Sequence, residues 1–134
     1  MRTLKVIVSK AGKGISAHLP EVDGYFIARS SVEKLKQDLP SGLLFHIEGL
    51  HEEERADWMN ETFSFEYVFS DIPTLIEGYS GLINQSSLAR ISGINESLMR
   101  QYVAGIKRPS HSVTVRIEAG LKKYAEELKS ISFA

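Results

Sequence analysis

Residues 85–110 read QSSLARISGINESLMRQYVAGIKRPS, and this stretch carries the strongest structural signal in the chain. Apolar residues recur at helical spacing on both sides of Gly93, which predicts two short helices joined by a tight turn. Ala89 is small enough for the helices to cross closely, Gly93 can take the positive φ of the turn, and Asn95 can cap the second helix. The pattern is typical of a helix-turn-helix.

Further helices are expected on both sides of this stretch. Asp71, or alternatively Ser70, can cap a helix that has Pro73 in its first turn. Gly105 is placed to end the second short helix in the left-handed conformation, and a final helix is expected over residues 112–130. We therefore expect an all-α domain over residues 70–134.

The N-terminal half shows the period of β-strands. Residues 4–9, 15–19 and 25–29 alternate between apolar and polar side chains and are separated by glycine-containing turns, which predicts a meander. Residues 63–69 alternate aromatic with other side chains and predict a fourth strand. Residues 1–69 are thus expected to form a domain of β-β-β-α-β order, with a small antiparallel sheet covered by a helix, and the fold class is α+β.

The helix of that domain is expected between residues 30 and 50. Apolar residues recur there at steps of three and four, and Ser30 and Glu33 have the spacing of a capping box. Pro40 lies in the middle of the apolar stripe, where it removes a backbone hydrogen bond. The sequence therefore predicts a kink or a break at Pro40 within one continuous packing face.

Composition and charge limit the possible functions. The 134 residues include no cysteine and no apolar run of about 18 residues, which excludes disulfides, cysteine-ligated zinc and a membrane span. The first residues lack the pattern of a secretory signal, so we expect a cytoplasmic protein. Residues 1–78 carry 8 Lys/Arg and 13 Asp/Glu, a net charge of −5, whereas residues 79–134 carry 8 and 4, a net charge of +4. The basic part suits nucleic acid and the acidic part does not.

The C-terminal stretch resembles the lambda-repressor/Cro-type (XRE) family of helix-turn-helix proteins. The shared features are Gln85 before the first short helix, Leu88-Ala89 within it, Gly93 and Ile94 in the turn, Gly105 after the second helix, and Pro109-Ser110. This family usually has five helices, which the resemblance places between residues 71 and 130. The resemblance implies that the domain binds double-stranded operator DNA.

The N-terminal segment resembles the HicB antitoxin fold, a partial RNase-H-like module. The resemblance rests on residues 20–24 between two strands and on residues 31–33 at the start of the helix. The chain departs from that family at Tyr25, where cysteine is common, at Pro40, and in the long acidic loop over residues 51–60. The combined arrangement is similar to HicB-family antitoxins. It implies a transcriptional autorepressor and type II antitoxin that neutralises a small HicA-like mRNA-cleaving toxin.

DNA contacts are expected from the residues around the two short helices. Arg100 can bond guanine through two hydrogen bonds and Gln101 can bond adenine, although a solvated helix face would show the same residues. Glu96 could accept from cytosine N4, since a carboxylate among phosphates otherwise weakens binding. Lys107 and Arg108 suit phosphates. The expected DNA-contacting residues are Gln85, Ser86, Glu96, Ser97, Arg100, Gln101, Lys107 and Arg108.

One such motif reads only a few base pairs, so we expect a homodimer or a higher homo-oligomer. The contact between the copies could come from the aromatic strand at residues 63–69 or from the last helix. Two other interpretations stay open. One is a stand-alone helix-turn-helix transcription regulator whose N-terminal domain only dimerises or senses a ligand. The other is a protein-interaction module that does not bind DNA.

An enzyme is not expected. The four histidines share no metal-ligand spacing, and the sequence has neither a phosphate-binding loop nor a dinucleotide-binding glycine motif. Ser31 and Lys34 match a Ser-x-x-Lys pattern, but a helix-capping serine explains it and the rest of that signature is missing. We therefore expect no catalytic residue, no metal and no cofactor.

Overall fold

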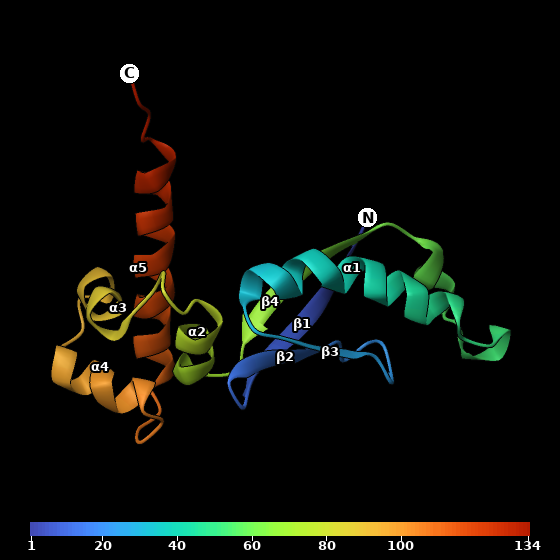
Figure 1. Ribbon diagram of the computed structural model, residues 1–134, viewed down its shortest axis with the longest axis horizontal. Helices are drawn as coiled ribbons and strands as arrows, with labels where there is room; N and C mark the ends of the chain where they lie inside the picture. Colours follow the sequence, from blue (N-terminus) through green and yellow to red (C-terminus); the bar gives the residue numbers. More distant parts are fainter. The chain divides into compact units, whose positions relative to one another are not determined.

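The computed structural model describes residues 1–134, and the chain divides into two compact units, residues 1–79 and 80–134. The α+β class predicted from the sequence is confirmed, with four strands and five helices (Figure 1). The first unit contains β1 (Arg2–Ala11), β2 (Gly14–His18), β3 (Phe26–Arg29), α1 (Val32–Glu48), two short 3-10 turns (Glu52–Glu54 and Asp57–Asn60), β4 (Phe63–Phe69) and α2 (Ile72–Gly78). The second contains α3 (Gln85–Ser92), α4 (Glu96–Val103) and α5 (His111–Lys129).

The four strands form one mixed sheet in the order β3-β2-β1-β4. β1 pairs antiparallel with β2 and parallel with β4, with Leu4 opposite Phe65 and Val8 opposite Phe69. The predicted all-antiparallel sheet is therefore wrong at β4. Alternation along a strand reports which face is buried but not the direction of the strand. The connection through α1 returns the chain to the end of the sheet where β1 starts, which is how parallel neighbours are joined.

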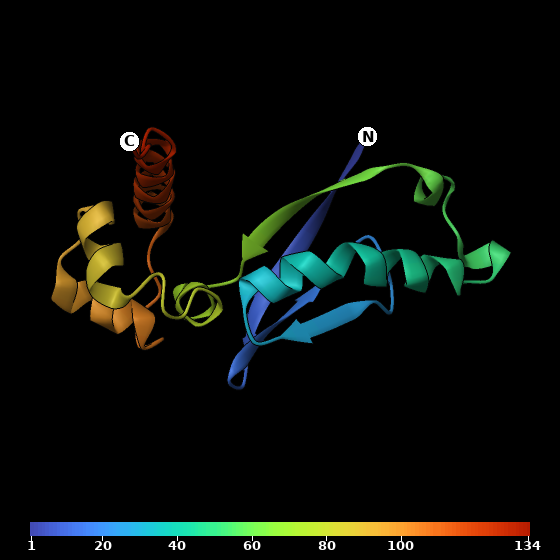
Figure 2. The same ribbon diagram turned by 45° about the horizontal axis from the view of Figure 1, so that its top comes forward.

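Helix α1 covers one face of this sheet (Figure 2). The core between them consists of apolar side chains that are at most 7% exposed. From the strands these are Leu4, Val6, Val8, Ile15, Ala17 and Ile27, and from α1 they are Val32, Leu35, Leu39, Leu43 and Ile47. Burying these residues removes most of their apolar area from water, which is the main driving force for folding this unit.

Helix α1 is continuous through Pro40, so the break that the sequence allows there does not occur, and the buried stripe continues on both sides of the proline. Its N-cap is Ser31, whose Oγ accepts a hydrogen bond of 3.3 Å from the Lys34 backbone N–H. The predicted capping box at Ser30 and Glu33 is therefore wrong: the cap is the next serine, and the residue three positions after it is Lys34, whose side chain cannot accept a hydrogen bond from the cap. The expected continuous packing face is confirmed, because burial of the stripe outweighs the one hydrogen bond that Pro40 removes.

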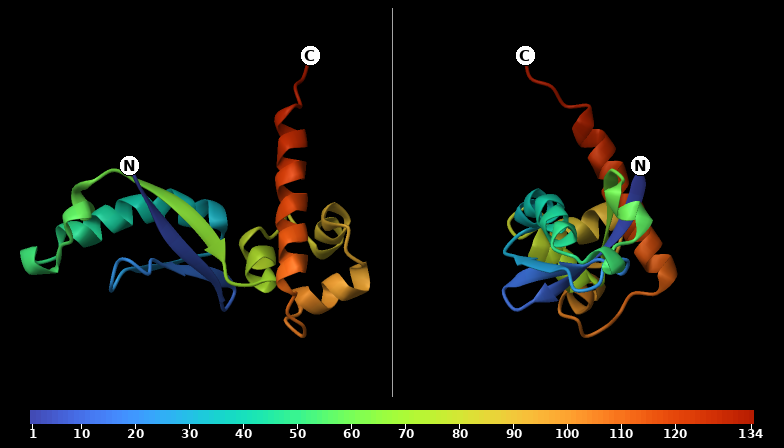
Figure 3. Two further views of the ribbon diagram at one scale, coloured as in Figure 1. Left: turned by 180° about the vertical axis from the view of Figure 1, so that it is seen from behind. Right: turned by 90° about the vertical axis from the view of Figure 1, so that its right-hand side faces the viewer.

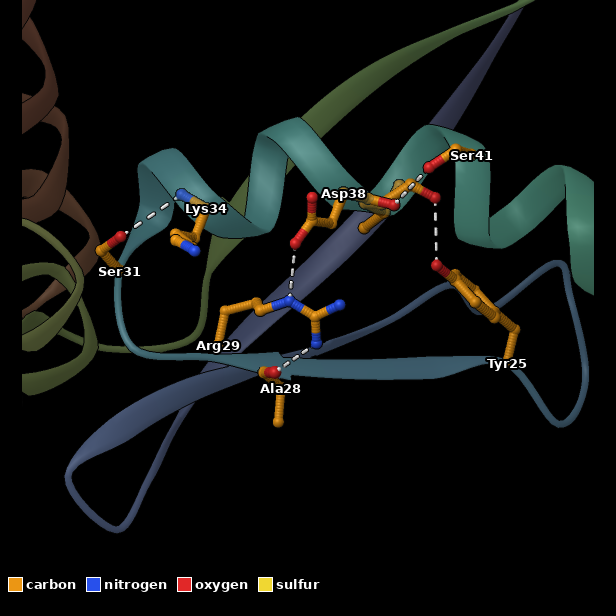
Figure 4. A network of polar contacts seen from close by, with 8 residues as sticks. Tyr25, Ala28, Arg29, Ser31, Lys34, Asp38 and Ser41 are labelled. Carbon is orange, nitrogen blue, oxygen red and sulfur yellow. Dashed lines mark hydrogen bonds and ion pairs between the residues drawn. The ribbon is translucent and has the colours of Figure 1, made fainter.

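Polar contacts join α1 to the edge strand β3 (Figure 4). The Tyr25 hydroxyl donates to the carbonyl of Leu39 at 3.0 Å. Arg29 Nε donates to Asp38 Oδ2 at 2.8 Å, and Arg29 Nη1 donates to the carbonyl of Ala28 at 2.7 Å. One guanidinium thus binds both a carboxylate of the helix and a backbone carbonyl of the strand.

Helix α2 packs against the sheet of the first unit. Thr74 is fully buried, and its Oγ1 accepts a hydrogen bond of 2.9 Å from the Lys10 backbone N–H of β1. Gly78 lies so close to α1 that an added Cβ would be 2.5 Å from a methyl group of that helix. The boundary between the units therefore falls after Tyr79, later than the predicted boundary at residue 69, because these contacts attach α2 to the sheet.

In the second unit, α5 crosses α3 closely. A Cβ added at Gly120 would lie 2.3 Å from the carbonyl oxygen of Ile91, so only glycine allows this approach. The buried residues are Leu88, Ala89, Ser92, Ile94, Met99, Tyr102 and Ile117. Four helices lie between residues 71 and 130, where the family resemblance implies five, because α5 is a single helix of 19 residues.

The second half of α5 extends beyond α3 and α4 (Figure 3). Every residue from 122 to 130 is exposed, although several of these side chains are apolar. No helix of the chain combines the length and the apolar character needed to cross a lipid bilayer.

Candidate nucleic-acid interface

Helices α3 and α4 are joined by a turn whose geometry matches the sequence prediction. Asn84 Oδ1 caps α3 by accepting from the Ser87 backbone N–H at 2.8 Å. Gly93 ends α3 with a φ of +66°, in the left-handed region that favours glycine. Asn95 Oδ1 caps α4 by accepting from two backbone N–H groups, those of Ser97 and Leu98. The predicted roles of Gly93 and Asn95 are confirmed.

Helix α4 has one buried and one exposed face. Met99 is fully buried and Tyr102 is 4% exposed, so these two side chains anchor the helix to its unit. The exposed face carries Glu96, Ser97, Arg100, Gln101 and Ala104. Their spacing of one, three, one and three residues follows the helical repeat, so four polar side chains and the small Ala104, which caps the end of α4, form one continuous strip.

The predicted residues outside α4 lie near its two ends. Gln85 and Ser86 open α3, and the Ser86 Oγ donates a hydrogen bond of 2.5 Å to Glu96 Oε1 at the start of α4. After α4, the backbone N–H groups of Ile106 and Lys107 both donate to the carbonyl of Gln101, at 3.0 and 3.3 Å. The structure therefore brings the start of α3 to the start of α4.

The loop after α4 carries the basic residues of the site. Gly105 has a φ of +75°, the left-handed conformation that the sequence predicts. Lys107 and Arg108 follow and are both exposed. Because the backbone of Lys107 bonds to Gln101, the loop keeps its positive charge at the C-terminal end of α4.

The electrostatics of the segment are strongly one-sided. Between residues 80 and 117 there are five Arg/Lys and a single carboxylate, that of Glu96. Basic side chains on an exposed helix and on the loop beside it are what a phosphate backbone requires. Chemically, the site can bind a polyanion and can also present hydrogen-bonding side chains to base edges.

No family model, curated protein or solved structure matches this chain. The two family resemblances thus rest on their sequence motifs alone. The role of the exposed face of α4 has to be inferred from its own geometry and charge.

The sequence does not predict a role for two arginines of this unit. Arg90 is exposed on α3 four residues after Ser86, a helical spacing that could have revealed it. Arg116 of α5 donates through Nη2 to the carbonyl of Gly93 at 2.5 Å and so holds the turn between α3 and α4. No local pattern indicates that contact, because 23 residues separate its partners.

No group of three or more His, Asp or Glu side chains is placed to hold a metal ion. The sequence expectation that the protein is not an enzyme stays a prediction.

Proposed function

We propose that the second unit is a helix-turn-helix that binds double-stranded DNA, and that the protein is a transcriptional autorepressor. The observation that carries this proposal is the two-faced α4. Met99 and Tyr102 fix one side in the core, while the opposite side presents only polar and small residues beside a basic loop. A short helix exposed in this way fits the major groove.

The exposed residues divide by their chemistry. Arg100 can donate two hydrogen bonds to guanine, and Gln101 can both donate to and accept from adenine. Lys107 and Arg108 suit phosphates, which position the protein on DNA without reading its sequence. Gln85 and Ser97 have polar groups that can also reach phosphates or base edges.

We propose that the protein acts as a homodimer, with a second copy covering the end of α5. Tyr124 and Leu128 are 47% and 49% exposed, and they continue the face of α5 that begins with the partly buried Leu121. Ile131, which is 58% exposed, follows just after the helix ends. In an antiparallel pair of these helices about a two-fold axis, Tyr124 would lie opposite Leu128, so this stripe complements itself. The aromatic side chains of β4, the alternative contact, pack against the core of the first unit.

We further propose that the first unit blocks a basic partner, a HicA-like toxin of the mRNA-cleaving type. The support is the resemblance to HicB antitoxins together with the net charge of −5 over residues 1–78. Opposite charge accelerates association and favours the correct partner. If no such partner exists, the protein is a stand-alone transcription regulator whose first unit only dimerises or senses a ligand.

Titration of the purified protein with the DNA upstream of its own gene tests the DNA-binding proposal. A random duplex of equal length is the control, and both are titrated between about 50 and 200 mM salt. We expect tighter binding to the upstream DNA and a steep loss of affinity as salt rises. Equal affinity for both duplexes would contradict sequence-specific repression.

The partner proposal needs a separate experiment. The protein is purified together with the product of the adjacent gene, and the complex is analysed by size-exclusion chromatography. We expect co-elution and a loss of RNA cleavage by the partner. Separate elution would leave the stand-alone regulator as the better description.

A further inference from the structure

Glu96 is an unusual residue for a surface that binds phosphates. It is the single carboxylate between residues 80 and 117, it is exposed, and it lies in the first turn of α4. Its recorded side-chain partner is a hydroxyl rather than a cation, because Oε1 accepts the hydrogen bond of 2.5 Å from Ser86. Glu96 takes part in none of the ion pairs of the structure.

A carboxylate at this place selects among the bases. It accepts hydrogen bonds and cannot donate them, and in the major groove only cytosine N4 and adenine N6 donate. Adenine also presents the acceptor N7 beside N6, which would repel the second carboxylate oxygen. Cytosine carries a C–H rather than an acceptor beside its amine, on the side away from the paired guanine O6. The pairing chemistry therefore favours cytosine.

The bond from Ser86 determines how the carboxylate is presented. Binding to Oε1 restricts the rotation of the long Glu96 side chain, and Oε2 keeps its capacity to accept from a base. A side chain that is already ordered loses less conformational entropy when it binds. Ser86 is then a positioning residue, rather than the direct DNA contact that the sequence predicts.

We infer that Ser86 and Glu96 act together to make the recognised DNA specific for cytosine at one position, an inference that rests on the proposed function. The bond between them links the first turns of α3 and α4, the two elements closest to the groove in the proposed complex. Glu96 supplies the acceptor for cytosine N4, and Ser86 holds it. The same carboxylate lowers affinity for DNA that lacks a cytosine there, because it faces phosphates without compensation.

Selection from a library of randomised duplexes tests this inference without knowledge of the natural DNA site. The full-length protein, Glu96→Gln and Ser86→Ala each select their preferred sequences, which are then counted by sequencing. Glu118→Gln is the matched control, because it removes one exposed carboxylate of the same unit from α5. Circular dichroism confirms that all four proteins are folded.

We expect the unchanged protein to select cytosine at one position. Glu96→Gln should reduce that preference by about tenfold or more while the rest of the motif persists, since an amide can donate as well as accept. Ser86→Ala should weaken the preference at the same position and at no other. Glu118→Gln should select the unchanged motif.

Other outcomes separate failure of this inference from failure of the proposed function. If Glu96→Gln selects the same motif as the unchanged protein, or if Ser86→Ala alters a different position, the inference is wrong and DNA binding by α4 stands. If the unchanged protein enriches no sequence, the proposed function itself is wrong and the inference falls with it. If Glu96→Gln fails to fold, Ser86→Ala tests the inference alone: a weaker preference for cytosine at the one position supports it, and an unchanged motif or a change at a different position contradicts it.

Discussion

Arg100 and Lys107 should play different parts in DNA binding, although both are exposed cations near α4. Arg100→Ala should cost about 1–3 kcal/mol on the preferred DNA and relax the choice at one base pair. Lys107→Ala should weaken binding to all sequences alike and lower the salt slope by about 1. Binding isotherms on preferred and random DNA at several salt concentrations measure both effects. Equal losses on both DNAs for both variants would contradict these roles.

Gly120 controls the crossing of α5 over α3. The methyl group of Gly120→Ala would lie 2.3 Å from the carbonyl oxygen of Ile91, so the helices must separate. Overpacking of this kind destabilises by about 1–3 kcal/mol. Chemical denaturation followed by far-UV circular dichroism measures the change. Ala119→Ser, at the exposed neighbouring position, should change stability by less than about 0.5 kcal/mol, and an equal effect of both variants would show that the close crossing is not the cause.

Local sequence predicts single-residue roles well where the partners are close in the chain. The predictions for Gly93 and Asn95 are confirmed, and of the two caps predicted for α2 the structure uses Asp71 rather than Ser70, since a cap or a turn is formed within about four residues. The bond between Ser86 and Glu96 and the bond from Arg116 to the turn could not be predicted. Both depend on how separate helices pack, and no spacing rule describes that.

The link between β3 and α1 should respond to alkaline pH. Burial raises the pKa of Tyr25 above its usual 10.0, the Arg29 cation lowers it, and Asp38 raises it. The folded state therefore prefers the neutral phenol. The stability that comes from this preference is complete below about pH 10 and is lost as the pH rises through the folded pKa. Burial, with a smaller effect of Tyr25, also raises the pKa of Tyr67, so this ring adds to the alkaline loss.

Tyr25→Phe separates these contributions. At neutral pH the variant should lose about 0.5–1.5 kcal/mol, because the hydrogen bond to the Leu39 carbonyl disappears. Above pH 10 its stability should decline less than that of the unchanged protein, with Tyr67 causing the remainder. Urea denaturation followed by the fluorescence of Trp58, in the same unit, measures both. The same alkaline decline in both proteins would rule out Tyr25 as a source.

At the scale of elements, the sequence predicts which segments are helices and strands but not how two of them pair. Periodicity located all four strands, and the stripe of α1 was correctly expected to continue past Pro40. The parallel pairing of β4 and the packing of α2 on the sheet were missed. Strand direction and the partner of a short helix are set by the path of the connecting segments, which periodicity does not record.

For the whole molecule, the apolar stripe at the end of α5 should determine the oligomeric state. Leu128→Glu places a charge in that stripe and should convert the dimer into a monomer with weaker DNA binding, because one motif reads few base pairs. Sedimentation velocity measures the mass. Lys122→Glu also changes a charge on α5, about 140° around the helix from the stripe, and should leave the dimer intact. A dimer that survives Leu128→Glu would place the contact elsewhere.

The two units of the molecule carry opposite net charges. The acidic unit contains the sheet, and the basic unit contains α3 and α4. One chain can therefore attract a basic partner to its first unit and an acidic partner to its second. This asymmetry was visible in the sequence. The sequence did not show that the negative unit extends to Tyr79, because that depends on the buried Thr74.

The hydrogen bond from the Arg29 guanidinium to the Ala28 carbonyl affects the tendency of the protein to aggregate at high concentration. Open strand edges recruit further strands and start fibrillar aggregates. On β3, a backbone acceptor is already occupied by a cation that Asp38 keeps in place. In a concentrated solution, the charged Arg29 side chain on this edge strand therefore opposes the addition of strands from other molecules, and with it the formation of cross-β aggregates.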